Sequence, residues 1–523
     1  MNSSRTEFFY RVARAFRTSE RKKNALKADL NVALETMNAH DMMACLENQY
    51  QQGSDLVDIR ILLDKCRQRG WKKTEIDKLE IMDCYYFKSD MARTADLALH
   101  YLDDAPTDPD TLVIGMTSLY CCGLFEESLA VFFRAKKNER QFSGRMDFYL
   151  NSAVILWANA RLPEAEIHIN KASQIAPEDV EVLYNAHAIH FESGNQEALD
   201  TIRPKLLSNV EDDRVAMALA LSDLAQNRYL EGFRLLNSCL STRNAHRAPQ
   251  GVCRWDGESV AGKTLLILYE QGLGDTIQMA RYLYEILALE PIEIVMISQP
   301  ETLSLLQFNF PRIFFYAVKP DDLGIAYDYW INTMSLPYVF QTSVDSLPVR
   351  SGYLRLPTEN FDYWHQRVDT LARKDRPRIG IAWSGRPQHQ ANMRRSIPFE
   401  RMMNAIRPID ADFFALQTSV PPNHPDHLID ISDELVTLAD TAALIAEMDI
   451  IITVDTSIVH LAGAIGKETW LLLPYRYEWR WGLEGERNNW YESVKVLRQP
   501  THGDWNSVLS DVFDHRFISR GWV

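Results

Sequence analysis

Residues 264–276 read TLLILYEQGLGDT, and this stretch decides the fold of the carboxy-terminal half. Its first part, residues 264–268, is a short apolar run typical of a buried strand. Gly272 and Gly274 then allow a tight turn, and we expect a helix to begin near Thr276. A strand, a Gly-rich turn and a helix in succession predict an α/β domain with a parallel sheet.

The same pattern recurs along the rest of this half. Further strands are expected at residues 292–297, 325–332, 378–383, 412–417, 449–454 and 469–474. Two consecutive sets of alternating strands and helices predict two doubly wound (Rossmann-like) α/β domains, at 246–370 and 371–523. Ligands of such folds bind beyond the carboxyl ends of the strands, so the loops that follow the strands are candidate sites.

The amino-terminal half, residues 1–245, is expected to be helical almost throughout. The clearest helix pair matches the landmark positions of the tetratricopeptide (TPR) pattern with Tyr149, Ala153, Leu156, Ala165, Ile169, Ala172 and Pro177. About four such repeats are predicted across 105–245, after a helical region at 1–104. Stacked helix pairs usually grip a peptide or a protein, so this region is either a docking arm for a partner or a structural brace.

Composition excludes several classes of protein. The 523 residues are 46% hydrophobic and 24% charged, which is typical of a globular protein with several domains. A net charge of −15 repels phosphate backbones and argues against a nucleic-acid partner. No run approaches the ~20 apolar residues of a membrane span, and the first residues carry no secretory signal. The seven cysteines form no CxxC pair, so we expect reduced thiols in a cytoplasmic protein.

The first candidate site is the loop that holds Gln271, Gly272, Gly274 and Asp275. Backbone N–H groups at the start of a helix can face an anion or another acceptor. A helix amino terminus also keeps a carboxylate ionised, and an ionised Asp275 can take a hydroxyl proton as a general base. Asp is equally a preferred N-cap residue, and the sequence alone favours that capping role.

The second candidate site follows another strand, where Trp383, Ser384 and Gly385 open a loop that contains Arg395. Ser384 and Gly385 can offer backbone N–H groups to a phosphate. Arg395 can neutralise the charge of a diphosphate leaving group. The alternative interpretation is a solvated basic loop.

The third candidate site follows the buried strand before Asp455, and a helix is expected to begin at Thr456 or Ser457. Its free N–H groups and its dipole suit a phosphate. His460 lies on the same helical face as Thr456, so both can address one ligand, although a structural role for His460 fits as well. Gln417, which ends a neighbouring strand, either reads a base or sugar hydroxyl or bridges two loops. No metal-ligand constellation stands out in the sequence.

Taken in order, these motifs resemble a bacterial family that couples TPR repeats to a glycosyltransferase module of the GT-B type. The module is similar to the ADP-heptose:lipopolysaccharide heptosyltransferases and, more distantly, to the protein O-GlcNAc transferases. The resemblance covers about 245–510. It is carried by Trp255-Asp256-Gly257, residues 270–276, Trp383-Ser384-Gly385, Arg395-Ser396-Ile397-Pro398, Val454-Asp455-Thr456 and His460.

The resemblance implies roles for individual residues: a general base at Asp275, a contact to the donor diphosphate at Arg395, and donor binding at Asp455, Thr456 and His460. Heptosyltransferases usually carry Gly where this chain has Ser457, so ADP-heptose is not implied as the donor. Enzymes of this kind usually need no metal and no cofactor. Flagellin-modifying members combine the same two halves, which implies a protein acceptor such as flagellin.

Together with the residues, the resemblance implies a GT-B glycosyltransferase, of the inverting type, that moves a sugar from a nucleotide donor to a protein Ser/Thr hydroxyl. The donor is expected on 371–523 and the acceptor over 246–370, with the repeats recruiting the acceptor. Two alternatives stay open. One is a non-catalytic TPR adaptor whose GT-B module is inactive. The other is a transferase that builds lipopolysaccharide.

Overall fold

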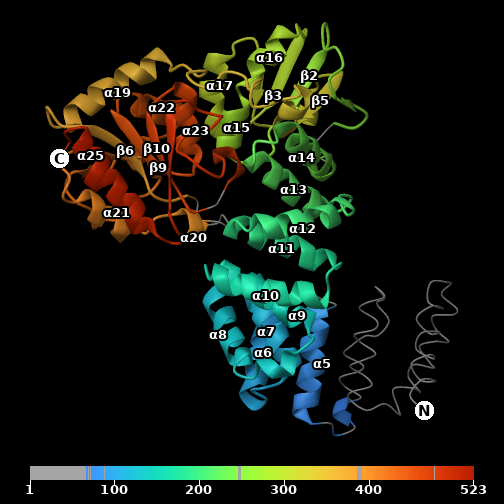
Figure 1. Ribbon diagram of the computed structural model, residues 1–523. Coiled ribbons are helices and arrows are strands. Elements are labelled where there is room, and N and C mark those ends of the chain that lie inside the picture. The colour runs from blue at the N-terminus through green and yellow to red at the C-terminus, as the bar shows by residue number, and fades with distance from the viewer. Residues whose placement is uncertain are drawn as a thin grey trace. The chain divides into compact units, whose positions relative to one another are not determined.

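The structure is a computed structural model that describes residues 66–522, apart from 69, 71, 87–88, 245–248, 386–391 and 476–477. Most of the helical region expected at 1–104 therefore lies outside the described residues. The chain divides into two compact units, residues 1–185 and 186–523, and the division falls inside helix α11 (Val180–Ser193) (Figure 1). Among the described helices, none combines the length and the apolar character that crossing a membrane requires.

The described part of the first unit is built from helices joined by short turns. They are α5 (Lys73–Tyr86), α6 (Met91–Asp104), α7 (Pro109–Cys121), α8 (Phe125–Lys136), α9 (Met146–Ala158) and α10 (Leu162–Ile175). Neighbouring helices pack against each other, as α6 does on α7 and α9 on α10. Ala153 and Ala165, the expected small contact residues of the α9–α10 pair, are fully buried. The prediction of a helical amino-terminal half is confirmed for these residues.

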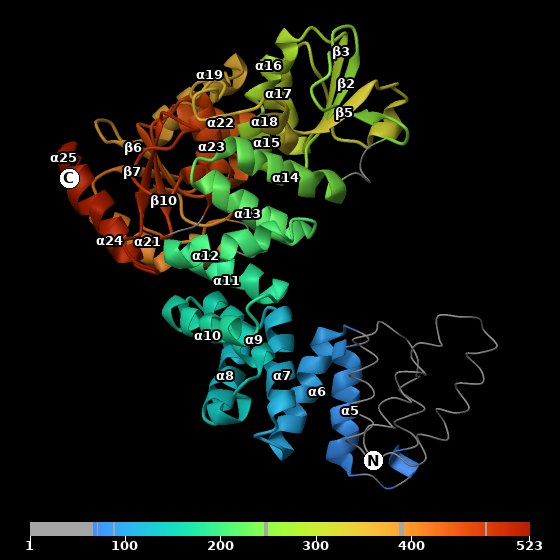
Figure 2. The ribbon, with the colours of Figure 1, turned by 45° about the vertical axis from the view of Figure 1, so that its right-hand side comes forward.

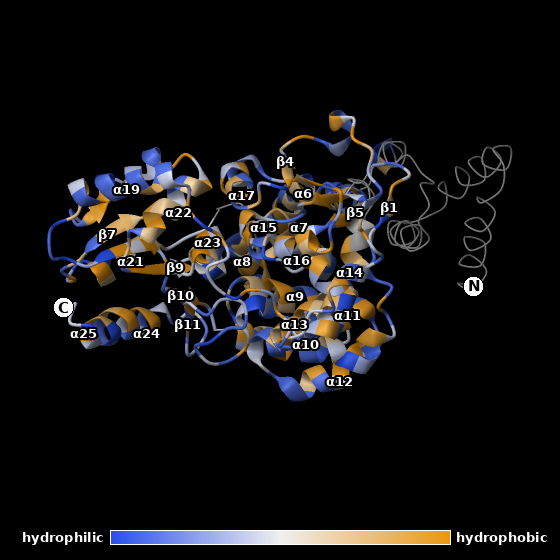
Figure 3. Cartoon of the chain, turned by 90° about the horizontal axis from the view of Figure 1, so that it is seen from above, coloured by the Kyte–Doolittle hydropathy of each residue, from blue (hydrophilic) through white to orange (hydrophobic). Residues whose placement is uncertain are grey.

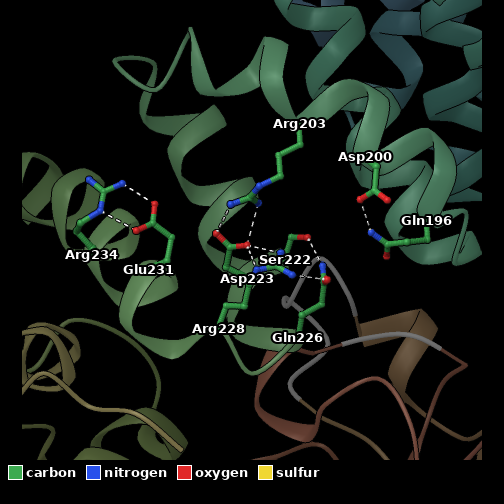
Figure 4. Close-up of polar contacts among 9 residues, drawn as sticks. All are labelled: Gln196, Asp200, Arg203, Ser222, Asp223, Gln226, Arg228, Glu231 and Arg234. Atoms are coloured by element: carbon green, nitrogen blue, oxygen red, sulfur yellow. Dashed lines mark hydrogen bonds and ion pairs between the residues drawn. The ribbon is translucent and has the colours of Figure 1, made fainter.

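The second unit begins with further helices, α12 (Gln196–Leu207), α13 (Asp213–Ala225) and α14 (Tyr229–Asn244). The carboxylate of Asp223 is completely buried at the end of α13. Arg203 donates two hydrogen bonds to it, at 2.8 and 2.9 Å, and Arg228 Nε donates a third at 2.8 Å (Figure 4). A buried carboxylate is tolerated only when it is paired in this way, so the cluster joins the α13–α14 turn to α12.

The first sheet follows these helices and is wholly parallel in the order β1-β5-β2-β3-β4. Its strands are β1 (Cys253–Arg254), β2 (Thr264–Leu268), β3 (Glu293–Ile297), β4 (Phe314–Tyr316) and β5 (Tyr329–Asn332). Its helices are α15 (Leu273–Met279), α16 (Tyr282–Ala288), α17 (Leu303–Asn309) and α18 (Leu336–Val339). Helix α14 packs against α18, so the last helix before the α/β parts contacts a helix of the first sheet (Figure 2).

The second sheet is also parallel, in the order β11-β10-β9-β6-β7-β8. Its strands are β6 (Arg378–Ala382), β7 (Asp412–Ala415), β8 (Leu428–Ile429), β9 (Ile450–Val454), β10 (Thr469–Leu473) and β11 (Val494–Arg498). The associated helices are α19 (Thr358–Leu371), α20 (Asn392–Arg395), α21 (Phe399–Ile406), α22 (Leu438–Ala446), α23 (Ser457–Ile465), α24 (Trp505–Ser510) and α25 (Phe517–Ser519). The prediction of two parallel-sheet α/β parts is confirmed.

Side chains alternate across this second sheet, as strand geometry requires. Ile379, Ile381 and Ile452 share one core with residues of α21 and α24. The strands are strongly hydrophobic in Figure 3, whereas α19 is mainly hydrophilic and buries only Trp364 and Val368. Helix α19 packs against α22 of the second sheet. The expected boundary between the two α/β domains at residue 370 stays a prediction.

Candidate functional site

The strand ends place the predicted site residues as the sequence suggests. Strand β2 leads through a short loop to Asp275, and strand β9 leads directly to Asp455. Strand β6 leads to Trp383, and strand β10 leads to a loop that contains Arg480. All strands of each sheet are parallel, so these loops leave the carboxyl edges of the two sheets, where ligands of such folds bind.

Asp275 occupies the third position of α15, which begins at Leu273 and not near Thr276 as expected. Gly272 is the N-cap residue, and its backbone N–H donates to Asp275 Oδ2 at 2.9 Å. The N-cap interpretation of Asp275 was therefore wrong in position, although its carboxylate does satisfy an N–H at the helix start. The other oxygen, Oδ1, accepts a hydrogen bond from Arg480.

Arg480 is a residue that the sequence analysis missed, and it connects the loops of both sheets. Its Nε donates to Gln278 Oε1 at 2.6 Å and its Nη1 donates to Glu478 Oε2 at 2.7 Å. Its guanidinium lies 4.3 Å from the centre of the Trp479 ring. Burial disfavours the charged form, but the carboxylates of Glu478 and Asp275 outweigh that cost and hold the pKa of Arg480 above its ordinary value.

Asp455 shares this environment. Burial is the main reason that its pKa rises to about 7, and the neighbouring Glu478 carboxylate adds to the rise. Arg480 and Arg395 act in the opposite direction, because a nearby positive charge favours the ionised form. Burial also raises the pKa of Glu478. The cluster therefore places two carboxyl groups of raised pKa, Asp455 and Glu478, close to two guanidinium groups.

Arg395 ends the short helix α20 and donates from Nη1 to the backbone oxygen of Asp455 at 2.9 Å. Its Nε is buried and has no hydrogen-bond partner in the part of the chain that the structure describes. A Cβ atom on Gly385 would collide with the guanidinium, so the absence of a side chain at Gly385 makes room for Arg395. An unsatisfied buried N–H beside the start of α23 is a ready donor for an anion.

Gln417 bridges two loops, which is one of the two roles the sequence left open. Its Oε1 accepts from the backbone N–H groups of Trp383 and Ser384, at 3.1 and 3.2 Å. Its Nε2 donates to Ser384 Oγ at 3.0 Å. The N–H of Gly385 donates to Asn392 Oδ1 at 3.1 Å. The N–H groups that we expected to meet a phosphate therefore already have side-chain acceptors.

Helix α23 begins as predicted. Thr456 is the N-cap residue, and its Oγ1 accepts from the N–H of Ile458 at 3.3 Å. Ser457 is the first helical residue. The nine residues of α23 give it a dipole whose positive end lies at this start, beside Asp455 and Arg395.

His460 is buried inside α23, and its Nδ1 shares a hydrogen bond of 2.9 Å with the Tyr491 hydroxyl. Burial, aided by the charges of Arg480 and Arg281, lowers the pKa of His460 well below its ordinary value. His460 is thus neutral and packed against the helix α15 that carries Asp275. These contacts favour the structural interpretation of this residue.

Arg281, in the turn between α15 and α16, is a second buried cation between the two sheets. Its guanidinium lies 4.8 to 5.1 Å from the ring centres of Tyr353, Trp490 and Tyr491. Its Nη1 donates to the Trp490 backbone oxygen at 2.9 Å. Aromatic faces attract a guanidinium, so this cage ties the first sheet's helices to the loop before β11.

The loop residues before Asp275 are more exposed. Gln271 is exposed, and its backbone oxygen accepts a hydrogen bond of 3.0 Å from Gln299 Nε2. The missed residues Glu478 and Arg480 carried a recognisable signal, because both charges lie among tryptophans in a loop directly after a strand. Among the described residues, His, Cys, Asp and Glu form no group of three or more that could hold a metal ion.

Two parallel-sheet parts whose strand-end loops share one buried ionic cluster define an α/β protein with a composite site. No family model matches the chain. Protein FlbA of Caulobacter vibrioides is 23% identical over 380 residues, which span 66% of this chain and 63% of FlbA. The match thus covers less than two thirds of that relative.

Two solved structures resemble the chain at low sequence identity. The ADP-heptose lipopolysaccharide heptosyltransferase II of E. coli matches with a TM-score of 0.36 and 12% identity, over 49% of this chain and 96% of that chain. A point mutant of the Thermobaculum terrenum O-GlcNAc transferase matches with a TM-score of 0.32 and 11% identity, over 86% of this chain and 92% of that chain. Because both TM-scores are low, the function proposed below rests on the geometry of the chain itself.

Proposed function

We propose that the chain is a metal-independent glycosyltransferase of the GT-B type that moves a sugar from a nucleotide-sugar donor to a protein hydroxyl. One observation carries the proposal. Arg480 donates to Asp275 from the first sheet and is near enough to Asp455 of the second sheet to favour its ionised form, while Arg395 donates to the backbone oxygen of Asp455. A proton acceptor from one sheet thus lies in the same cluster as anion-binding groups from the other.

The donor diphosphate would bind at the start of α23. The N-cap Thr456, the N–H of Ser457 and the helix dipole all favour an anion there. Arg395 would use its unsatisfied Nε to stabilise the charge of the departing nucleoside diphosphate. The loop at Trp383, braced by Gln417, would hold Arg395 and the nucleotide in place.

The acceptor hydroxyl would approach Asp275 over the first sheet. Its proton passes to the Asp275 carboxylate, and its oxygen forms the new bond to the anomeric carbon. The bond between that carbon and the diphosphate breaks, and the electron pair leaves with the nucleoside diphosphate. A single displacement of this kind inverts the anomeric configuration. The donor is consumed as a substrate, and no cofactor enters the reaction.

The helix pairs of the first unit would recruit the acceptor. We propose that they are TPR-type repeats, because their buried small residues follow the spacing expected for such repeats. A stacked repeat suits a protein acceptor, and flagellin, met in the cytoplasm, is the first acceptor to test.

Thermal unfolding in the presence of UDP-, GDP-, ADP- and CMP-sugars tests the donor. One class should raise the melting temperature through mass action, and Arg395→Ala should remove that shift. The same donor should then support transfer by the wild type but not by Asp275→Asn. If none of these sugars shifts the melting temperature, the chain is better described as a non-catalytic adaptor. If transfer goes to lipopolysaccharide and not to protein, the proposed acceptor is wrong.

A further inference from the structure

We propose that Arg480 is a positioning residue that sets the orientation of the Asp275 carboxylate relative to the donor side of the site. This inference rests on the proposed role of Asp275 as the general base. The observation behind it is that the guanidinium contacts groups from both sheets at once. It meets Asp275 and Gln278 on α15 and Glu478 in the loop after β10.

The contacts use the fixed geometry of the guanidinium. Nε, Nη1 and Nη2 each donate to a different side chain, namely Gln278, Glu478 and Asp275. A planar group that donates in three directions holds its partners at fixed relative positions, which the single ammonium of Lys cannot do. The Asp275 carboxylate is thus oriented by a group that belongs to the other sheet.

Arg480 itself is anchored independently of Asp275. Its guanidinium is stacked on Trp479, and the Trp479 ring is contacted by Phe233 of α14 with the ring centres 5.8 Å apart. Arg498 Nη2 donates to the carbonyls of Trp481 and Gly482, at 2.8 and 2.9 Å, and so fixes the rest of the loop. Arg480 is therefore fixed by its own loop, and it holds Oδ1 of Asp275 while the Gly272 N–H holds Oδ2.

The orientation leaves Asp275 able to act as a base. Oδ2 accepts from Gly272 N–H and Oδ1 accepts from Arg480, so each oxygen is held by one donor. An ionised carboxylate has about four lone-pair sites, and the described residues occupy two of them in Asp275, which leaves room for an acceptor hydroxyl. Such a carboxylate is both fixed in orientation and competent to take a proton.

A double-mutant cycle tests the inference. The assay uses the sugar nucleotide that stabilises the protein in the donor screen. It measures the single-turnover release of nucleoside diphosphate with water in place of the acceptor. Arg480→Lys should lower this rate about 100-fold in the wild-type background, while the donor-induced shift in melting temperature is retained. In the Asp275→Asn background, Arg480→Lys should lower the rate by less than about threefold relative to Asp275→Asn alone. The carboxylate that Arg480 orients is already absent from that background.

Arg498→Lys is the matched control, since it also perturbs the loop but its described hydrogen bonds go to backbone carbonyls. Arg498→Lys should lower the single-turnover rate by the same factor with and without the Asp275 carboxylate. Arg480→Gln gives a second variant with the same expected lack of additivity. If Arg480→Lys and Arg480→Gln cost the same factor with and without Asp275, Arg480 does not act through that carboxylate and the inference fails. If Asp275→Asn alone keeps the wild-type rate, the proposed base is wrong, which is a separate result.

Discussion

Gly274 in α15 lies against the imidazole ring of His460 in α23, so closely that a Cβ atom on Gly274 would fall 2.5 Å from His460 Cδ2. The starts of two helices, one from each sheet, can touch only because this position has no side chain. The contact keeps Asp275, the next residue, close to the loops of the second sheet. Glycine at this position is therefore a requirement of packing between the two sheets and not only of the turn.

Gly274→Ala should destabilise the second unit by about 1–3 kcal/mol, because the new methyl group overlaps a buried ring that has little room to move. Denaturant unfolding measures the loss. Gly272→Ala is the control: its φ is −74°, and a Cβ there would meet only Asp275 Oδ2 at 3.4 Å. Equal stability of the two variants would contradict the packing role of Gly274.

Because of Asp455, the free energy of unfolding should fall as the pH rises from about 4 through 7. Its carboxyl has a pKa of about 7 in the folded chain, above the ordinary 3.8, so the folded state keeps a proton that the unfolded chain releases. The stabilisation is complete below about pH 4 and is lost as the pH rises through 7. Asp455→Asn should remove about 2–4 kcal/mol of this pH dependence.

Unfolding free energies of wild type and Asp455→Asn at pH 5, 6, 7 and 8 check this prediction. Glu478, whose pKa is also raised by burial, interacts with Asp455, so Glu478→Gln and the double variant are measured alongside to separate the two carboxyl groups. Parallel curves for wild type and variant would show that Asp455 does not titrate in this range.

His168 in α10 should make the first unit less stable as the pH falls. Burial lowers its pKa to about 4, and its ring lies among Phe132, Phe148 and Tyr149. The unfolded chain binds the proton more readily, so stability is lost as the pH falls from about 6.5 toward 4. His168→Leu should remove roughly 2 kcal/mol of this acid sensitivity.

Amide exchange of α9 and α10 at pH 7 and pH 5, corrected for the intrinsic exchange rate, measures the effect. The control is His100→Ala, which changes an exposed histidine of α6. Loss of protection at pH 5 that is unchanged in His168→Leu would contradict the assignment.

Truncation should separate the two units at residue 186 but not at 246. Tyr229 and Phe233 of α14 contact Trp490 with ring centres 5.7 and 6.3 Å apart, so α14 completes this aromatic cluster of the second unit. Residues 186–523 should melt cooperatively and keep the donor-induced shift, whereas residues 246–523 should not. A 246–523 fragment that folds and responds to the donor would show that the α/β part does not need the helices that precede it.

Patterns of local sequence predict the secondary structure of this chain well. The apolar run at β9 and the threonine after Asp455 mark a strand end and a helix start because both depend on neighbours in the sequence. The same reasoning places the loops at the carboxyl ends of the strands. It places the start of α15 three residues too late, since Gly272 and not Asp275 is the N-cap residue.

Contacts between segments far apart in the sequence cannot be predicted from local patterns. Asp275 and Arg480 are 205 residues apart, and nothing in either local pattern says that they will meet. Their meeting depends on how α15 packs against the loop after β10. Gln417 shows the same limit, because its position at a strand end is equally compatible with ligand contact and with bridging the Trp383 loop.

Calorimetric titration of UDP, GDP, ADP and CMP into wild type, Arg395→Ala and Asp275→Asn tests the central claim most directly. The account predicts that one of these nucleotides binds the wild type. Arg395→Ala should weaken that binding about tenfold or more. Asp275→Asn should bind with wild-type affinity while it no longer transfers sugar. If none binds, or if Asp275→Asn weakens binding as much as Arg395→Ala does, the division of roles between the two sheets is wrong.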